Sequence, residues 1–149
     1  MAVTMSGEVV LPADKATVWA RLNDAETLKA SIPGCESLDK LSDTEMQAVA
    51  KIRIGPVSAR FKGKVNLSDL DPPNSYRISG QGDGGIAGFA KGGANVRLSD
   101  ADGGGTKLSY DVDAQIGGKI AQLGGRLIDS TAKKLADEFF ANFAKALSP

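Results

Sequence analysis

The chain has 149 residues, with 18 Lys and Arg balanced by 18 Asp and Glu, and it contains one Cys and no His. A single domain, residues 1–149, is expected, because a chain of this length can bury a hydrophobic core without disulfides or metals. The zero net charge gives no field that would attract a nucleic acid, and the absence of histidine excludes Ser-His-Asp triads and His-ligated metal sites.

The first part of the chain is predicted to form one strand and two short helices. Apolar and polar residues alternate over residues 3–11, which is the pattern of a half-buried strand. Asp14 can cap a short helix, and a second helix over residues 25–32 would end at Pro33-Gly34. Two consecutive short helices are therefore expected after the first strand.

Six further strands are predicted after these helices, which makes seven in all. Turn-forming sequences separate them, among them Gly55-Pro56, residues 71–74 and residues 102–105. The predicted strands cover residues 36–41, 46–54, 61–67, 76–81, 90–98 and 108–116.

The hydrophobic period becomes helical from residue 119 to residue 147, which predicts one long C-terminal helix. The predicted order is one strand, two helices, six strands and a long helix. This order is typical of an α+β fold in which the long helix covers an antiparallel sheet. Gly124-Gly125 lies inside the predicted helix, where each glycine costs about 1 kcal/mol relative to alanine. The pair is expected either to bring the helix closer to the sheet or to widen a cavity there.

Small residues occupy many of the positions predicted to face inward on the sheet. They are Ala48, Ala50, Gly63, Gly80, Ala90, Gly92, Ala94 and Ala114. Two interpretations are open: close packing of the helix on the sheet, or an apolar pocket between them. Tyr76 and Tyr110 also have inward parity, so their hydroxyl groups are the candidate polar groups of such a pocket.

A basic surface is predicted on the outer face of two neighbouring strands, where no acidic residue occurs between Met46 and Ser68. It consists of Lys51, Arg53, Arg60, Lys62 and Lys64. This surface could dock an acidic partner or an anionic membrane, or be a solvated face that discourages aggregation at a sheet edge. Carboxylates on the predicted strands have outward parity, so neither a catalytic pair nor a metal site is predicted.

Three segments carry a family resemblance: residues 32–36 (IPGCE), 88–92 (GFAKG) and 115–124 (QIGGKIAQLG). Together they resemble the CoxG family of carbon monoxide dehydrogenase subunits, within the START-like (SRPBCC) superfamily. The resemblance implies a helix-grip fold, in which the sheet wraps around the C-terminal helix and encloses an apolar cavity. It also implies an accessory protein of a carbon monoxide dehydrogenase-type molybdenum hydroxylase, acting in maturation, membrane recruitment or electron transfer through a bound quinone or lipid-like molecule.

The first functional hypothesis is a non-catalytic binding protein that holds a hydrophobic quinone or lipid and has no covalent cofactor. The residues expected to line its cavity are Leu28, Ile32, Ile52, Tyr76, Ile78, Phe89, Tyr110, Leu123, Gly124, Leu127 and Phe139. A second hypothesis is a START-like enzyme that acts on a hydrophobic carbonyl or cyclisable substrate, with Tyr76 or Tyr110 as proton donor.

A third hypothesis is a docking or assembly factor that binds an acidic subunit through the basic strands. The resemblance implies molybdenum hydroxylase subunits as partners, and the hypotheses add a hydrophobic small molecule and transient contact to a membrane surface, with no contact to nucleic acid. The single cysteine and the absence of an export signal or membrane span predict a cytoplasmic protein. The membrane recruitment that the resemblance implies adds a peripheral place at the inner face of the membrane.

Overall fold

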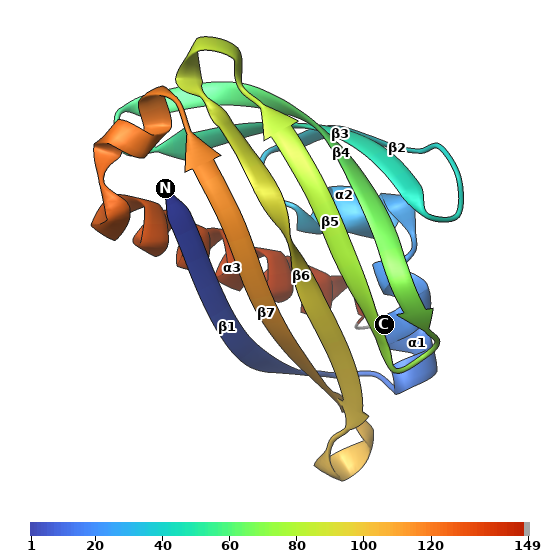
Figure 1. Ribbon diagram of the computed structural model, residues 1–149. Coiled ribbons are helices and arrows are strands. Elements are labelled where there is room, and N and C mark those ends of the chain that lie inside the picture. The colour runs from blue at the N-terminus through green and yellow to red at the C-terminus, as the bar shows by residue number, and fades with distance from the viewer. Residues whose placement is uncertain (148–149) are drawn as a thin grey trace.

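The structure is a computed structural model that describes residues 1–147, and one curved sheet with helices on its concave side makes up the molecule (Figure 1). The strands are β1 (Ala2–Leu11), β2 (Cys35–Lys40), β3 (Glu45–Ile54), β4 (Val57–Asp71), β5 (Ser75–Asp83), β6 (Phe89–Asp100) and β7 (Thr106–Gly117). The α-helices are α1 (Lys15–Leu22), α2 (Ala25–Ser31) and α3 (Gly125–Leu147). Three short 3₁₀ helices are η1 (Gly85–Ala87), η2 (Asp102–Gly104) and η3 (Lys119–Leu123).

The seven strands form one antiparallel sheet in the order β1-β7-β6-β5-β4-β3-β2. From β2 to β7 each strand pairs with the next along the chain, and β1 pairs with β7. The edges of the sheet are therefore β1 and β2, and α1 and α2 carry the chain from one edge to the other. The predicted seven-stranded antiparallel sheet is confirmed.

Helices α1 and α2 are each started by an aspartate, as the sequence predicts for the first of them. The Asp14 carboxylate accepts a hydrogen bond from the Thr17 amide (2.8 Å), and Asp24 accepts one from the Thr27 amide (3.1 Å). These carboxylates satisfy amides that have no partner within the helix. Helix α2 then packs on α3, where the Asn142 amide group donates to the Ser31 carbonyl (3.2 Å).

The C-terminal helix is shorter than the sequence predicts. Residues 119–123 form η3, the chain turns at Gly124, and α3 begins only at Gly125. Gly124 has a φ of 96°, a value that residues with a Cβ rarely adopt, and a Cβ built there would meet no atom within 4 Å. The prediction of one continuous helix from residue 119 is therefore wrong. Gly124 permits the backbone turn between η3 and α3. It neither brings the helix closer to the sheet nor widens the cavity.

The hydrophobic core consists of two clusters. The first lies under α1, α2 and the C-terminal half of α3, and its fully buried members include Leu11, Val18 and Phe143. The second lies near η1, η3 and the start of α3, where Ile120 and Ile128 are buried. Figure 1 shows α3 running across the concave side of the sheet between these two regions.

Candidate functional site

A cavity of about 300 Å³ lies within the first core cluster, between the concave face of the sheet and the three α-helices. All seven strands and all three helices contribute to its wall. The lining residues are Met5, Leu22, Leu28, Ile32, Leu38, Met46, Ala48, Val65, Leu67, Tyr76, Ile78, Ala94, Val96, Leu108, Tyr110, Val112, Ala136, Phe139 and Phe140. Two tyrosine hydroxyl groups are the polar side-chain groups of this lining, so the cavity suits a mostly hydrophobic molecule.

Small side chains lie at the centre of the concave face, next to the cavity. Cross-strand pairing places Ala48 opposite Gly63, Gly63 opposite Gly82, and Gly82 opposite Ala90. In the neighbouring row, Gly80 lies opposite Gly92. A Cβ at Gly82 would make only ordinary contacts, whereas at Gly63 and Gly80 it would lie within 3 Å of a backbone oxygen of the neighbouring strand. Glycine therefore both permits close approach of the strands and leaves this part of the face without side chains.

A second hollow of about 400 Å³ continues from the cavity along these rows. The two share five lining residues, namely Ala48, Val65, Ile78, Ala94 and Val112. Of the two interpretations of the small inward residues, the structure therefore favours a pocket over close packing at the centre of the sheet.

Tyr76 is the most deeply buried polar group of the cavity wall, with 7% of its surface exposed. Its ring packs edge-on against Trp19, with the ring centres 5.3 Å apart. Burial raises the pKa of the Tyr76 hydroxyl well above its ordinary value, so the group stays protonated at physiological pH. Because its hydroxyl forms no hydrogen bond with any group in residues 1–147, it retains an unused donor.

Tyr110 lies at the β1 side of the cavity. It faces Gly7 in the β1–β7 pair, and its hydroxyl occupies the space that a side chain at Gly7 would need. The ring stacks on Phe140, with the centres 5.3 Å apart. Partial burial raises the pKa of Tyr110, and the negative charge of Asp137 adds to this effect. Both phenols are therefore hydrogen-bond donors and not anions at neutral pH.

The structure brings together about half of the residues that the sequence predicts to line a cavity. Those in the wall are Leu28, Ile32, Tyr76, Ile78, Tyr110 and Phe139. Ile52, Leu123 and Leu127 instead pack in the second core cluster, and Leu127 lies against Gly55. Gly124 lies between η3 and α3, outside the wall.

Phe89 also lies outside the cavity wall. It is 50% exposed and covers Gly117 on the outer face, because it precedes the inward-facing Ala90 by one position. Sequence reasoning missed Ala136 and Phe140 in the cavity wall. Their spacing of four on the C-terminal helix, next to Phe139, was the available signal.

The five predicted basic residues lie together on the outer face of β3 and β4, and two of them have partners there. Lys51 faces Arg60 across the strand pair, and Arg60 forms an ion pair with Glu36 (2.7 Å). Arg53 donates to the Gly55 carbonyl (3.2 Å).

Lys62 and Lys64 form no ion pair with any residue from 1 to 147. Lys91 joins them, because Gln81 of β5 faces Lys64 on one side and Lys91 on the other. Sequence reasoning did not include Lys91 in this surface.

Residues 7–148 match the sequence model of a family described as a carbon monoxide dehydrogenase subunit, CoxG. The chain belongs to this CoxG family. The match spans nearly the whole sequence, as the predicted resemblance does. Family and fold together indicate a protein that binds a hydrophobic ligand.

Solved structures share the fold of this CoxG protein. A conserved protein from Geobacillus kaustophilus is 29% identical, with a TM-score of 0.91 over 97% of this chain and 95% of that one. A START superfamily protein from Mycobacterium smegmatis is 14% identical, with a TM-score of 0.73 over 97% and 96% of the two chains. The ZhuI aromatase/cyclase from Streptomyces sp. R1128 is 10% identical, with a TM-score of 0.71 over 99% and 94%. The helix-grip fold of the START-like superfamily is thus confirmed. A comparison with curated proteins finds no match.

Residues 1–147 offer neither a membrane-spanning helix nor a set of metal ligands. Within this range, none of the helices has the length and apolar character needed to cross a membrane. In the same residues, no three His, Cys, Asp or Glu side chains come together as metal ligands. Cys35 is partly buried, and this burial raises the pKa of its thiol.

Proposed function

We propose that this CoxG protein holds a quinone or another lipid-like molecule in its cavity and thereby serves a carbon monoxide dehydrogenase-type molybdenum hydroxylase. The observation that carries the proposal is the apolar cavity of about 300 Å³ that all seven strands and three helices enclose. In this proposal the protein is cytoplasmic and has no catalytic residue of its own. It presents the ligand for electron transfer, recruitment or maturation.

The size and polarity of the cavity support a hydrophobic ligand. Its volume corresponds to about ten water molecules at roughly 30 Å³ each, but its wall offers them few polar partners. A five-carbon prenyl unit would instead gain about 3 to 4 kcal/mol from burial, at about 0.8 kcal/mol per carbon group. A ring with a short chain therefore suits the cavity, and a longer chain could extend into the adjoining hollow.

The Tyr76 hydroxyl supports a ligand that carries an oxygen acceptor. The hydroxyl belongs to a side chain of the cavity wall and has no hydrogen-bond partner in residues 1–147, so it can donate to a bound molecule, and one neutral hydrogen bond contributes about 1 kcal/mol. A carbonyl oxygen of a quinone ring would supply the missing acceptor, while the rest of the molecule contacts aliphatic and aromatic side chains. The residues of the wall thus fit such a molecule.

The direct test is to purify the protein from a quinone-containing host, extract it with organic solvent and identify stoichiometric lipids or quinones by mass spectrometry. Two matched tryptophan variants on α3 test whether the ligand binds in the cavity. Ala136→Trp fills the cavity and is expected to lose the ligand, whereas Ala141→Trp, on the exposed side of the helix, is expected to retain it. Equal retention by both variants would place the ligand elsewhere.

The buried Tyr76 hydroxyl also supports a second candidate, a START-like enzyme with this group as proton donor to a hydrophobic carbonyl substrate. Its high pKa makes Tyr76 a weak acid, which favours hydrogen bonding over proton transfer. Tyr76→Phe separates the two candidates. A binding protein would keep its ligand with reduced affinity, about fivefold for one neutral hydrogen bond, whereas an enzyme would lose turnover.

A further inference from the structure

Strand β1 forms one edge of the sheet, and every second residue of it directs its backbone groups away from β7. The Met1 ammonium group donates to the Ile116 carbonyl (2.9 Å), and the Ile116 amide donates to the Met1 carbonyl (2.7 Å). Since bonded and non-bonded residues alternate in an antiparallel pair, the odd-numbered residues of β1 bond to β7 and the even-numbered ones do not. The residues of this outward row are Ala2, Thr4, Ser6, Glu8 and Val10.

None of the other elements in residues 1–147 binds the backbone of the outward row. Apart from the pairing with β7, no hydrogen bond within this range involves an amide or carbonyl group of these residues. All of them are exposed. Figure 1 shows β1 as the edge strand, with β7 on one side of it and α3 on the concave side of the sheet. The edge is therefore open to a further strand.

The opposite edge of the sheet is protected in ways that β1 is not. Strand β2 has six residues, half of them charged, and its register with β3 shifts between Cys35 and Ser37. A short, bulged or charged edge strand resists pairing with another chain. Strand β1 instead has ten residues in unbroken register with β7, contains neither lysine nor proline, and carries Glu8 as its one charged side chain. It thus retains the features that favour the addition of a strand.

The outward row of β1 is complementary to itself. When two β1 strands lie antiparallel with Ser6 opposite Ser6, Ala2 lies opposite Val10 and Thr4 lies opposite Glu8. Val10, which is 65% exposed, then meets an apolar residue, and the Thr4 hydroxyl can donate to the Glu8 carboxylate. A shift by two residues in either direction leaves backbone groups at one end of each row unpaired. The register centred on Ser6 is therefore the one that gives every residue of the row a partner.

Electrostatic repulsion does not oppose this pairing. The chain has no net charge, so two copies do not repel each other at long range. Glu8 already forms an ion pair with Lys107 of β7 (3.1 Å). In the register centred on Ser6, the two Glu8 residues lie about 14 Å apart along the strands, at roughly 3.4 Å per residue. This separation exceeds the screening length of about 8 Å at physiological salt.

We propose that two copies of this CoxG protein associate through their β1 strands, so that the two seven-stranded sheets become one continuous antiparallel sheet. Ser6 lies at the centre of this interface, and main-chain hydrogen bonds supply the affinity, as in other cases of strand addition. The proposal concerns the sheet edge and is independent of what the cavity holds.

Sedimentation equilibrium of the full chain tests this association, and the wild type is expected to dimerise as its concentration rises. Ser6→Pro removes an amide hydrogen that forms no bond within one copy, and proline is tolerated on an edge strand at such a position. Each copy then loses one hydrogen bond of the interface, so association should weaken by about tenfold or more. Ser6→Ala keeps the amide and is expected to associate within about twofold of the wild type.

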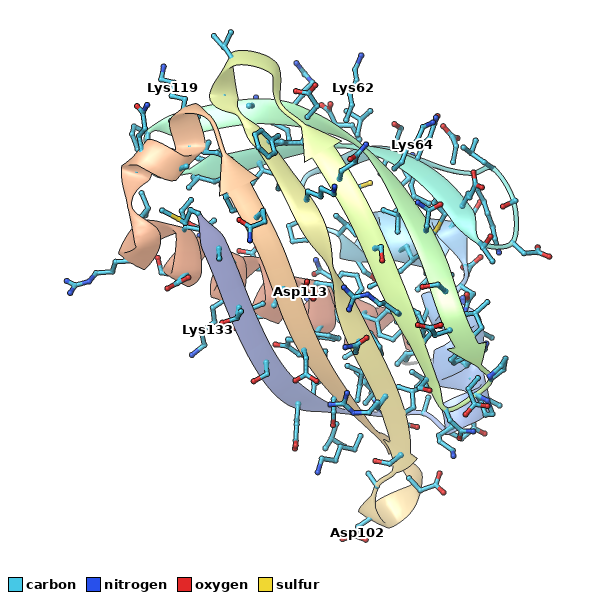
Figure 2. All side chains as sticks on the ribbon, viewed as in Figure 1. Lys62, Lys64, Asp102, Asp113, Lys119 and Lys133 are labelled. Atoms are coloured by element: carbon cyan, nitrogen blue, oxygen red, sulfur yellow. The ribbon has the colours of Figure 1, made fainter. Side chains whose placement is uncertain are left out.

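Cysteine cross-linking in a Cys35→Ser background tests the register. The Cα atoms of the two Ser6 residues should lie about 5.5 Å apart, within the range that a disulfide spans. Ser6→Cys is therefore expected to form a disulfide-linked dimer with oxidised glutathione. Val10→Cys separates the two thiols by about 27 Å along the strands, at roughly 3.4 Å per residue, and is expected to stay unlinked. Lys62→Cys, which lies on β4 and away from β1 in Figure 2, is the control on another strand.

A monomeric wild type, a Ser6→Pro dimer as stable as that of the wild type, or equal cross-linking of Ser6→Cys and Val10→Cys would each overturn the proposal. If the wild type is monomeric and Ser6→Pro instead loses a different protein, β1 adds to a strand of that protein and pairing with a second copy is wrong. Melting temperatures establish that the variants are folded. Should Ser6→Pro not fold, the cross-linking comparison decides.

Discussion

Helix α3 contacts the sheet in two different ways along its length. Near its ends, Ile128 is 5% exposed in the second core cluster and Phe143 is fully buried in the first. In its middle, Ala136, Phe139 and Phe140 border the cavity. The helix is therefore held at its ends and spans a hollow between them. Stability and ligand binding are assigned to different turns of the same helix.

Packing at both ends of α3 allows the fold to contain a cavity beneath the middle of the helix. An unfilled apolar volume removes packing contacts from the side chains around it. Fully buried side chains on either side of the cavity compensate, such as Phe143 of the first cluster, whose other members surround the cavity, and Ile120 of the second. Substitutions at the ends of α3 should therefore reduce folding stability, whereas substitutions in its middle should mainly change what the cavity can hold.

The largest effect is expected from Phe143→Ala, which should lower the free energy of unfolding by about 3 to 5 kcal/mol. Its matched partner is Phe139→Ala, on the same face and stacked on Phe143 with the ring centres 5.8 Å apart. Phe139 borders the hollow and has fewer contacts to lose, so we expect about 1 to 2 kcal/mol. Urea unfolding followed by Trp19 fluorescence measures both values. Equal losses would contradict the division of α3 into ends and middle.

The sheet could be predicted from the sequence because its signals are local. Alternation and turn sequences locate each strand, and parity states which face a side chain takes. Parity also indicates that Phe89 points outward, because Ala90 next to it points inward. The position of Phe89 outside the cavity could therefore have been predicted, although Phe89 is among the residues expected to line the cavity.

The location of the cavity along the sheet could not be predicted in the same way. Ile52 and Leu127 do face inward, but they lie at the end closed by the second cluster. Which end they reach depends on strand register and on where α3 crosses the sheet, and both are set by contacts distant in sequence. The break at Gly124 escapes prediction for a related reason, since helical periodicity continues on both sides of it.

A smaller effect is expected at the turn into α3, where two adjacent glycines differ in backbone conformation. Gly124→Ala should lower the free energy of unfolding by about 1 kcal/mol, because φ is 96° there. Gly125→Ala should be neutral or slightly stabilising, because this residue is helical and a Cβ would meet open space. Thermal unfolding of the two variants provides the comparison. If both variants lowered the free energy of unfolding equally, the added side-chain volume and not the backbone φ would determine the loss.

The smallest effect is expected at Asp24, whose helix α2 closes the first cluster through its contact with α3. Hydrogen bonds from the Thr27 hydroxyl and amide lower the pKa of this carboxyl below its ordinary value near 3.8. Because the pKa of Asp24 is lower in the folded protein than in the unfolded chain, the carboxylate stabilises the fold at pH values above its unfolded-state pKa. This contribution is lost as the pH falls through its folded-state pKa. The Asp24 side chain is 44% exposed, so screening by solvent should keep the loss below about 1 kcal/mol.

Asp24→Asn isolates this contribution, because asparagine also caps helices but does not titrate. Hydrogen exchange of the α2 amides at neutral and acidic pH is the appropriate measurement. Protection of α2 should decrease on acidification in the wild type and less so in Asp24→Asn, while amides near Ile120 in the second cluster should respond alike in both proteins. A matching change near Ile120 would mean that the two clusters open together, so that the ends of α3 do not hold the sheet independently.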